Sequence, residues 1–109
     1  MKDDRIYLEH ILESADKIID YTRGGREDFM RNPMAQDAVI RNFEIIGEAA
    51  KQLSDDFCKM HPDIPWNDMA RFRDVLIHHY MGISLTEVWN VVESHLPSLR
   101  AVITRTLNR

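Results

Sequence analysis

Apolar residues recur at helical spacing through most of the chain, and little of it shows the strict alternation that strands require. The first such pattern predicts an amphipathic helix over about residues 4–21. Gly24 and Gly25 follow it and are expected to end the helix, because glycine commonly occupies the position after a helix C-terminus. The apolar face of this helix is expected to bury Leu8, Ile11, Leu12, Ala15, Ile18 and Ile19.

A second helical pattern begins near Met34, and Gly47 within it predicts close contact with another helix rather than a turn. The segment 54–65 contains two prolines and is expected to be a loop. A third helix follows this loop and should end near Gly82. The apolar faces of the two helices comprise Ala35, Ala38, Val39, Phe43, Ile46, Ala49, Ala50 and Leu53, and then Trp66, Met69, Ala70, Phe72, Leu76 and Ile77.

Ser84 and Glu87 have the spacing of a capping box, which predicts that a further helix starts there. Pro97 removes one backbone hydrogen bond from this helix and should kink or restart it. The sequence therefore predicts an all-α fold, an antiparallel up-and-down bundle of four to five helices with short connections. The apolar face of the last helical pattern comprises Leu85, Val88, Trp89, Val92, Leu96, Leu99 and Ile103.

A length of 109 residues suffices for one hydrophobic core, so residues 1–109 are expected to form a single domain. Acidic residues occupy the N-terminal segment where a secretory signal would be basic, and no apolar run approaches the roughly 18 residues that span a bilayer. We therefore expect a cytoplasmic protein that does not contact the membrane. The lone Cys58 fits a reducing compartment and is expected to serve only in packing.

The formal net charge of −4 argues against a general nucleic-acid coat protein, because such proteins need a broad excess of Lys and Arg. Any contact with RNA must then be local. The phosphate-loop, dinucleotide-binding and zinc-protease motifs are absent from the sequence, and no Glu has a His three residues later. We therefore expect neither a metal nor a nucleotide cofactor.

Charged and titratable residues are densest in the segment 71–82. On a helix, which turns about 100° per residue, Arg73 and Tyr80 share a face, whereas His78 lies about 140° from Arg73. Arg73 and His78 can converge if the helix frays before Gly82, or if a second copy of the chain supplies the opposite wall of a cleft. The second arrangement is the more economical and predicts a homodimer.

Arg73, Asp74, His78 and Tyr80 follow the pattern R-D-x-x-x-H-x-Y, which resembles the signature of the HEPN superfamily and, within it, the HepT toxin branch. The segment 36–49 is similar to the second helix of that branch. The Pro-Trp pair before the motif and the Val-Trp pair after it also fit. The resemblance thus covers nearly the whole chain.

The resemblance implies a metal-independent endoribonuclease that cleaves RNA as a homodimer and is the toxin of a type VII toxin–antitoxin system. The partner it implies is an MntA-like nucleotidyltransferase antitoxin. In this family the antitoxin transfers AMP from ATP onto the motif tyrosine, which is Tyr80 here. A nucleotide attached there would block RNA sterically and electrostatically.

The motif residues make physical sense in these roles. RNA supplies its own nucleophile, the 2′-hydroxyl, so the protein need only move protons and stabilise phosphoryl charge. His78 is the candidate general base or acid, since an imidazole exchanges protons near neutral pH. Arg73 keeps its charge and can bind phosphate oxygens with two nitrogens. Asp74 is expected either to orient one of these neighbours or to pair with Arg71.

Each role has a structural alternative. Arg73 can form an ion pair with Asp74 or Glu87. His78 can interact with the dipole at a helix C-terminus, and Tyr80 can be a half-buried aromatic residue. The whole chain can also be a catalytically silent module that docks on a nucleotidyltransferase, which its acidic net charge favours. A DNA-binding repressor has the least support, because the sequence lacks a recognition helix rich in Arg, Lys, Asn and Gln.

Overall fold

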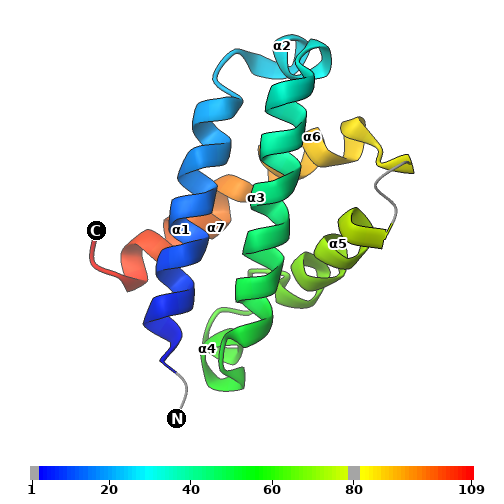
Figure 1. Ribbon diagram of the computed structural model, residues 1–109. Coiled ribbons are helices and arrows are strands. Elements are labelled where there is room, and N and C mark those ends of the chain that lie inside the picture. The colour runs from blue at the N-terminus through cyan, green and yellow to red at the C-terminus, as the bar shows by residue number, and fades with distance from the viewer. Residues whose placement is uncertain (1–2, 79–81) are drawn as a thin grey trace.

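The computed structural model describes residues 3–78 and 82–109, and these ranges contain α-helices and no β-strand (Figure 1). The prediction of an all-α fold is confirmed. None of the helices in these ranges has the length and apolar character needed to cross a membrane. Seven helices lie in the described ranges: α1 (Asp4–Tyr21), α2 (Gly25–Arg31), α3 (Pro33–Gln52), α4 (Asp55–Met60), α5 (Trp66–His78), α6 (Leu85–Ser94) and α7 (Leu96–Thr106).

The helix count exceeds the prediction because of two short helices and one break. Helices α2 and α4 have only 7 and 6 residues, too few to show a helical period, and they lie where the sequence predicted connections. The break separates α6 from α7, with Pro97 in the first turn of α7. Proline is accepted there because the N–H that it lacks has no partner within a helix. The predicted restart at Pro97 is confirmed.

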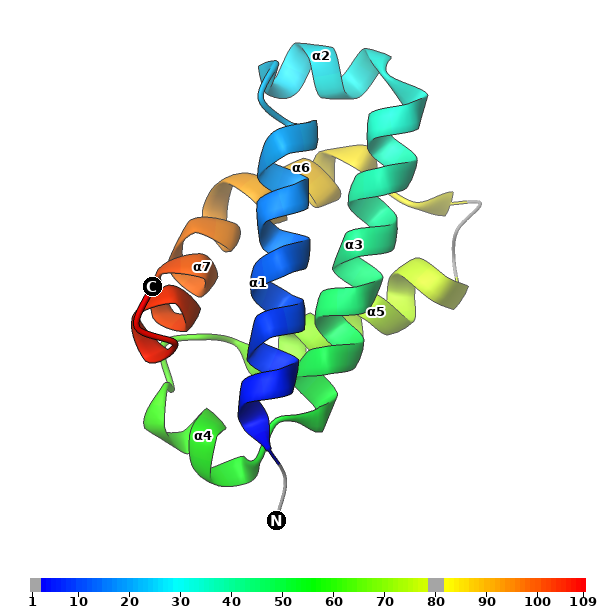
Figure 2. The ribbon, with the colours of Figure 1, turned by 60° about the vertical axis from the view of Figure 1, so that its left-hand side comes forward.

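Helices α1 and α3 are long antiparallel neighbours, joined at one end of the molecule by α2 (Figures 1 and 2). Helix α5 packs against α3 and crosses it obliquely, so that α3 lies between α1 and α5 (Figure 1). Helix α7 packs on α1 and on α6. The N-terminal half of α1 therefore lies beside the C-terminal half of α3.

Serine side chains determine where two of the helices begin. The hydroxyl of Ser84 accepts a hydrogen bond from the backbone N–H of Glu87 at 3.2 Å, as the capping spacing predicted. Ser54 caps α4 in the same way, accepting from the N–H of Phe57 at 3.1 Å. The backbone N–H and the hydroxyl of Ser54 also donate to the Asp4 carboxylate, at 2.8 and 2.6 Å. These bonds tie the first turn of α1 to the start of α4.

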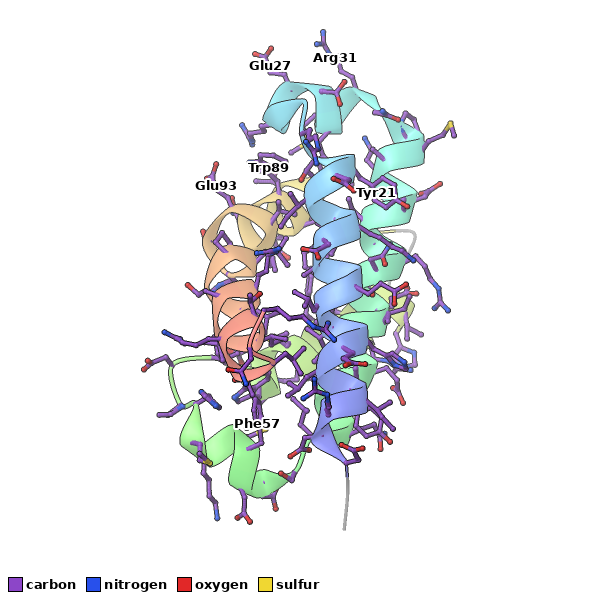
Figure 3. All side chains as sticks on the ribbon, turned by 90° about the vertical axis from the view of Figure 1, so that its left-hand side faces the viewer. Tyr21, Glu27, Arg31, Phe57, Trp89 and Glu93 are labelled. Carbon is purple, nitrogen blue, oxygen red and sulfur yellow. The ribbon has the colours of Figure 1, made fainter. Side chains whose placement is uncertain are left out.

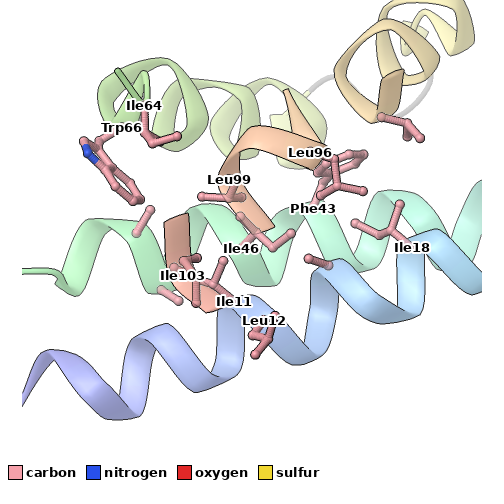
Figure 4. Close-up of a cluster of buried hydrophobic side chains, with 14 of the residues drawn as sticks. Ile11, Leu12, Ile18, Phe43, Ile46, Ile64, Trp66, Leu96, Leu99 and Ile103 are labelled. Carbon is pink, nitrogen blue, oxygen red and sulfur yellow. The ribbon is translucent and has the colours of Figure 1, made fainter. Parts of the chain in front are cut away.

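The hydrophobic core draws its side chains from α1, α3 and α7, as well as from the shorter helices (Figure 4). Most residues of the predicted apolar faces are buried, but Ile19 and Ile77 are each 37% exposed. Ile18 directly precedes Ile19, and Leu76 directly precedes Ile77, and both of these preceding side chains face the core. The side chain that follows each is turned by about 100° around the helix and so points away from the core. Phe29 of α2 is fully buried although no predicted apolar face included it.

Gly47 allows α5 to approach α3 closely. A Cβ atom at this position would collide with the Cβ of Arg73 and would lie 3.0 Å from the carbonyl oxygen of Met69. The predicted helix contact at Gly47 is therefore confirmed, and the partner is α5. This contact places Arg73 directly against the surface of α3.

Candidate functional site

Arg73 lies on α5 and its side chain, 25% exposed, extends along the surface of α3. Its Nε is 3.1 Å from Oε2 of Glu48 on α3, and its Nη1 donates to Oδ1 of Asp74 at 3.0 Å. Two carboxylates on two helices thus hold one guanidinium. Among the described residues, Nη2 of Arg73 makes no hydrogen bond, so this nitrogen can bind an oxygen from outside the chain.

Asp74 lies between two cations. Its Oδ1 also accepts from Nζ of Lys51 on α3, at 3.5 Å. The hydrogen bond from Arg73 is the main cause that lowers the pKa of Asp74 below its ordinary value, and Lys51 lowers it further. Asp74 is therefore hydrogen-bonded to Arg73, one of the two neighbours that it was expected to orient. The alternative pairing with Arg71 is wrong, because Arg71 pairs with Asp68 instead.

The structural alternative for Arg73 was an ion pair with Asp74 or Glu87. The pair with Asp74 is confirmed, and the second carboxylate that pairs with Arg73 is that of Glu48 and not that of Glu87. The cluster of Lys51, Arg73, Glu48 and Asp74 contains two cations and two carboxylates and has no net charge. Its effect is to fix the direction of the guanidinium. A fixed donor needs no reorganisation when charge develops on a bound group.

Arg73 also lines a groove between three helices, which we call the α1–α3–α5 groove. It has a volume of about 380 Å³. Helix α1 contributes Tyr7 and His10, α3 contributes both polar and apolar residues, and α5 contributes Arg73 and Ile77. The α3 residues in its wall are Arg41, Glu44, Ile45, Glu48, Ala49 and Gln52.

His78 is the last residue of α5 and is exposed, and it is not among the residues that line the α1–α3–α5 groove. Because α5 is helical up to this residue, the predicted separation of about 140° from Arg73 persists. The structure therefore does not bring Arg73 and His78 together within one chain. Tyr80, the candidate for modification, lies outside the described residues.

The sequence predicts that Glu48 forms an interhelical ion pair or a dimer contact, and its pair with Arg73 joins α3 to α5. Two other residues of this region, Tyr7 and His10, were not predicted to belong to it. No signal in the sequence pointed to them, because α1 and α5 are far apart in the sequence and only the packing of both on α3 brings them to one groove. Within the ranges that the structure describes, no three His, Cys, Asp or Glu side chains form a group that suits a metal ion.

Comparisons with known proteins place the chain in a family. A family model described as "Ribonuclease HepT-like" matches residues 11–106. The chain is 47% identical over 95 residues to the "Probable ribonuclease HepT" of Thermococcus cleftensis, covering 86% of each protein.

Two further relatives carry the name "Putative RNase". One, from Methanocaldococcus jannaschii, is 45% identical over 98 residues, which is 89% of this chain and 81% of the relative. The other, from Caldanaerobacter subterraneus, is 37% identical over 110 aligned positions, which cover 100% of this chain and 98% of the relative. No solved structure gives a significant match. The chain therefore belongs to the HepT-like ribonuclease family of the HEPN superfamily.

Proposed function

We propose that this protein is a metal-independent endoribonuclease and the toxin of a type VII toxin–antitoxin system. One observation carries the proposal beyond family membership: Arg73 is held by Glu48 and Asp74 in the wall of the α1–α3–α5 groove. A guanidinium fixed in this way suits the stabilisation of charge on a phosphoryl group, since Nη2 remains available to a phosphate oxygen.

The reaction needs only proton transfer and charge stabilisation. The imidazole of His78 removes the proton from a ribose 2′-hydroxyl, whose oxygen then forms a bond to the neighbouring phosphorus. The bond between that phosphorus and the 5′-oxygen of the next nucleotide breaks, and this oxygen takes a proton from a second imidazole. Arg73 stabilises the charge on the phosphoryl oxygens during the exchange. The products are a 2′,3′-cyclic phosphate and a 5′-hydroxyl.

The separation of Arg73 and His78 on α5 supports a homodimeric site. One chain does not place both residues on the same groove, and His78 is exposed at the end of α5. In a homodimer whose twofold axis lies beside this end of α5, the partner subunit's His78 would approach Arg73 and would also supply the second imidazole that the reaction requires.

The proposed regulation is AMPylation of Tyr80 by an MntA-like nucleotidyltransferase antitoxin. In this step the phenolic oxygen forms a bond to the α-phosphorus of ATP, the bond to the β-phosphate breaks, and pyrophosphate leaves while the phenolic proton passes to solvent. The added phosphodiester carries a negative charge two residues from His78. That charge would repel the RNA backbone and the adenosine would occupy the space that RNA needs.

A second function, a catalytically silent module that docks on the nucleotidyltransferase, has one specific observation in its favour. The charge of Arg73 is balanced by Glu48 and Asp74, and the whole chain has a net charge of −4. The electrostatic attraction of this protein for the phosphates of RNA is therefore weak and confined to a small part of its surface. In this reading the two carboxylates hold Arg73 as a structural bridge between α3 and α5.

RNA cleavage by the purified protein in excess EDTA distinguishes the two functions. The natural chain and a His95→Ala control, altered at an exposed histidine between α6 and α7, should cleave equally. His78→Ala should reduce cleavage by about 100-fold or more, as expected for loss of general acid–base catalysis. If the natural chain leaves a panel of RNAs intact, the ribonuclease proposal is wrong for those RNAs and the silent module is preferred.

A second assay tests the regulation. Incubation with ATP and an MntA-like nucleotidyltransferase should add the mass of AMP to the natural chain and abolish its RNA cleavage. Tyr80→Phe should keep the nuclease active and should gain no mass. Addition of AMP to Tyr80→Phe would place the modification on another residue.

A further inference from the structure

The α1–α3–α5 groove combines the side-chain types that recognise a nucleotide. The half-buried ring of Tyr7 and the side chain of His10 lie on its α1 side, and Arg41 and the amide of Gln52 lie on its α3 side. Proteins that bind single-stranded RNA use aromatic rings to stack on bases and Arg or amide groups to bind phosphates and base edges. None of these four residues belongs to the motif that carries the proposed chemistry.

The two carboxylates in the groove wall do not prevent the approach of a phosphate. Glu44, whose side chain is 19% exposed, pairs with Arg41 at 3.3 Å, and Glu48 pairs with Arg73 at 3.1 Å. Each acidic residue is therefore matched by a cation in the same groove. The imidazole N–H of His10 and the remaining guanidinium nitrogens supply the hydrogen-bond donors.

The size and position of the groove favour a single nucleotide. Its volume of about 380 Å³ lies near the lower end of small-molecule sites, which run from about 300 to 1,000 Å³. Arg73 forms part of its wall, so a nucleotide bound there would be next to the phosphate on which Arg73 is proposed to act. A base that enters between helices must be unpaired, which excludes a duplex.

We propose that the α1–α3–α5 groove binds one unpaired nucleotide of the RNA substrate beside the scissile phosphate. Tyr7 stacks on the base, and His10 and Arg41 bind the adjoining phosphate or ribose. This inference rests on the proposed ribonuclease function and identifies the substrate as single-stranded RNA. Tyr7, His10 and Arg41 are binding residues, whereas proton transfer stays with His78.

Direct RNA binding tests this site separately from cleavage. The experiment uses the full chain with His78→Ala as the parent, and fluorescence anisotropy with a labelled, unstructured RNA oligonucleotide. Adding Tyr7→Ala should weaken binding by about tenfold, the scale of one lost base stack. Tyr7→Phe keeps the ring and should bind like the parent.

Tyr21 provides the matched control, because it is an exposed tyrosine on the same helix. It lies at the end of α1 that leads to α2, and it is not among the residues that line the groove (Figure 3). Tyr21→Ala should leave the RNA affinity unchanged. In the chain that keeps His78, His10→Gln and Arg41→Ala should raise KM severalfold with little effect on kcat, whereas Arg31→Ala should change neither parameter.

Three outcomes would overturn the site. The groove holds no nucleotide if the parent does not bind the oligonucleotide. The same conclusion follows if Tyr7→Ala binds the oligonucleotide as tightly as the parent and has an unchanged thermal unfolding curve. If Tyr7→Ala instead alters the sedimentation coefficient by dissociating a dimer, the groove is an interface between copies of the chain. Loss of binding in Tyr7→Ala combined with no cleavage by the natural chain would support the nucleotide site while contradicting the ribonuclease function.

Discussion

Nε of Arg73 lies 3.1 Å from Oε2 of Glu48, one residue after the glycine that lets α5 touch α3. Gly47 and Glu48 therefore act on the same arginine in different ways. The glycine brings the backbone of α5 close enough, and the carboxylate then fixes the direction of the guanidinium. Packing and electrostatics at this crossing together position the residue proposed to stabilise phosphoryl charge.

Gly47→Ala should destabilise the fold and misplace Arg73. The added methyl group would collide with the Cβ of Arg73, and overpacking of this kind costs about 1–3 kcal/mol. Urea unfolding should show the loss, and RNA cleavage should fall even at temperatures where the variant is folded. Gly82→Ala is the control, because a Cβ there meets no atom of the described residues within 4 Å. Equal stability of the two variants would contradict the close crossing of α3 and α5.

Glu48→Gln should reduce RNA cleavage severalfold while leaving the fold almost unchanged. The amide keeps the shape of the side chain but holds the guanidinium less firmly, and the partly exposed ion pair contributes under about 1 kcal/mol to stability. Single-turnover cleavage and urea unfolding measure the two effects. Glu13→Gln, which removes the exposed pair with Lys17 on α1, is the matched control and should change neither. A Glu48→Gln variant with full activity would show that the pair does not position Arg73.

Asp74→Asn should make the stability of the protein less dependent on pH in the acid range. The pKa of Asp74 is lowered in the folded state, first by the hydrogen bond from Arg73 and then by Lys51. A lowered pKa stabilises the fold above the ordinary value of 3.8, and this stabilisation disappears as the pH falls through the lower folded value. Urea unfolding of the natural chain and of Asp74→Asn at pH 6 and pH 3 measures this effect, and the two free energies of unfolding should differ more at pH 6. A larger difference at pH 3 than at pH 6 would contradict a lowered pKa of Asp74 in the folded state.

Phe29→Ala should be among the most damaging core substitutions, although Phe29 belongs to a helix of only 7 residues. The side chain is fully buried and its ring centroid lies 5.6 Å from that of Trp89. Removal of such a ring costs about 3–5 kcal/mol. Thermal unfolding measures the loss, with the exposed Met34→Ala as control. A change no larger than that of the control would mean that α2 contributes little to the core.

Local patterns predicted those elements whose causes are local. The first helix has the predicted bounds of residues 4–21, Ser84 caps the start of α6, and Pro97 lies in the first turn of a new helix, because periodicity, capping and proline act within a few residues. Helices α2 and α4 escaped prediction for the opposite reason. They are too short to show a period and are stabilised by side chains such as Phe29 and Phe57, which are buried against other helices.

Residue patterns along the chain were enough to predict the all-α class, the helix contact at Gly47 and the segment that carries the family motif, since each depends on neighbouring residues. Tertiary packing was needed to establish that Glu48 is the partner of Arg73 and that Tyr7 and His10 join the same groove. These relationships depend on the angle at which α5 crosses α3 and on the packing of α1 beside them. Such geometry arises from contacts between distant segments, and residue spacing along one chain does not encode it directly.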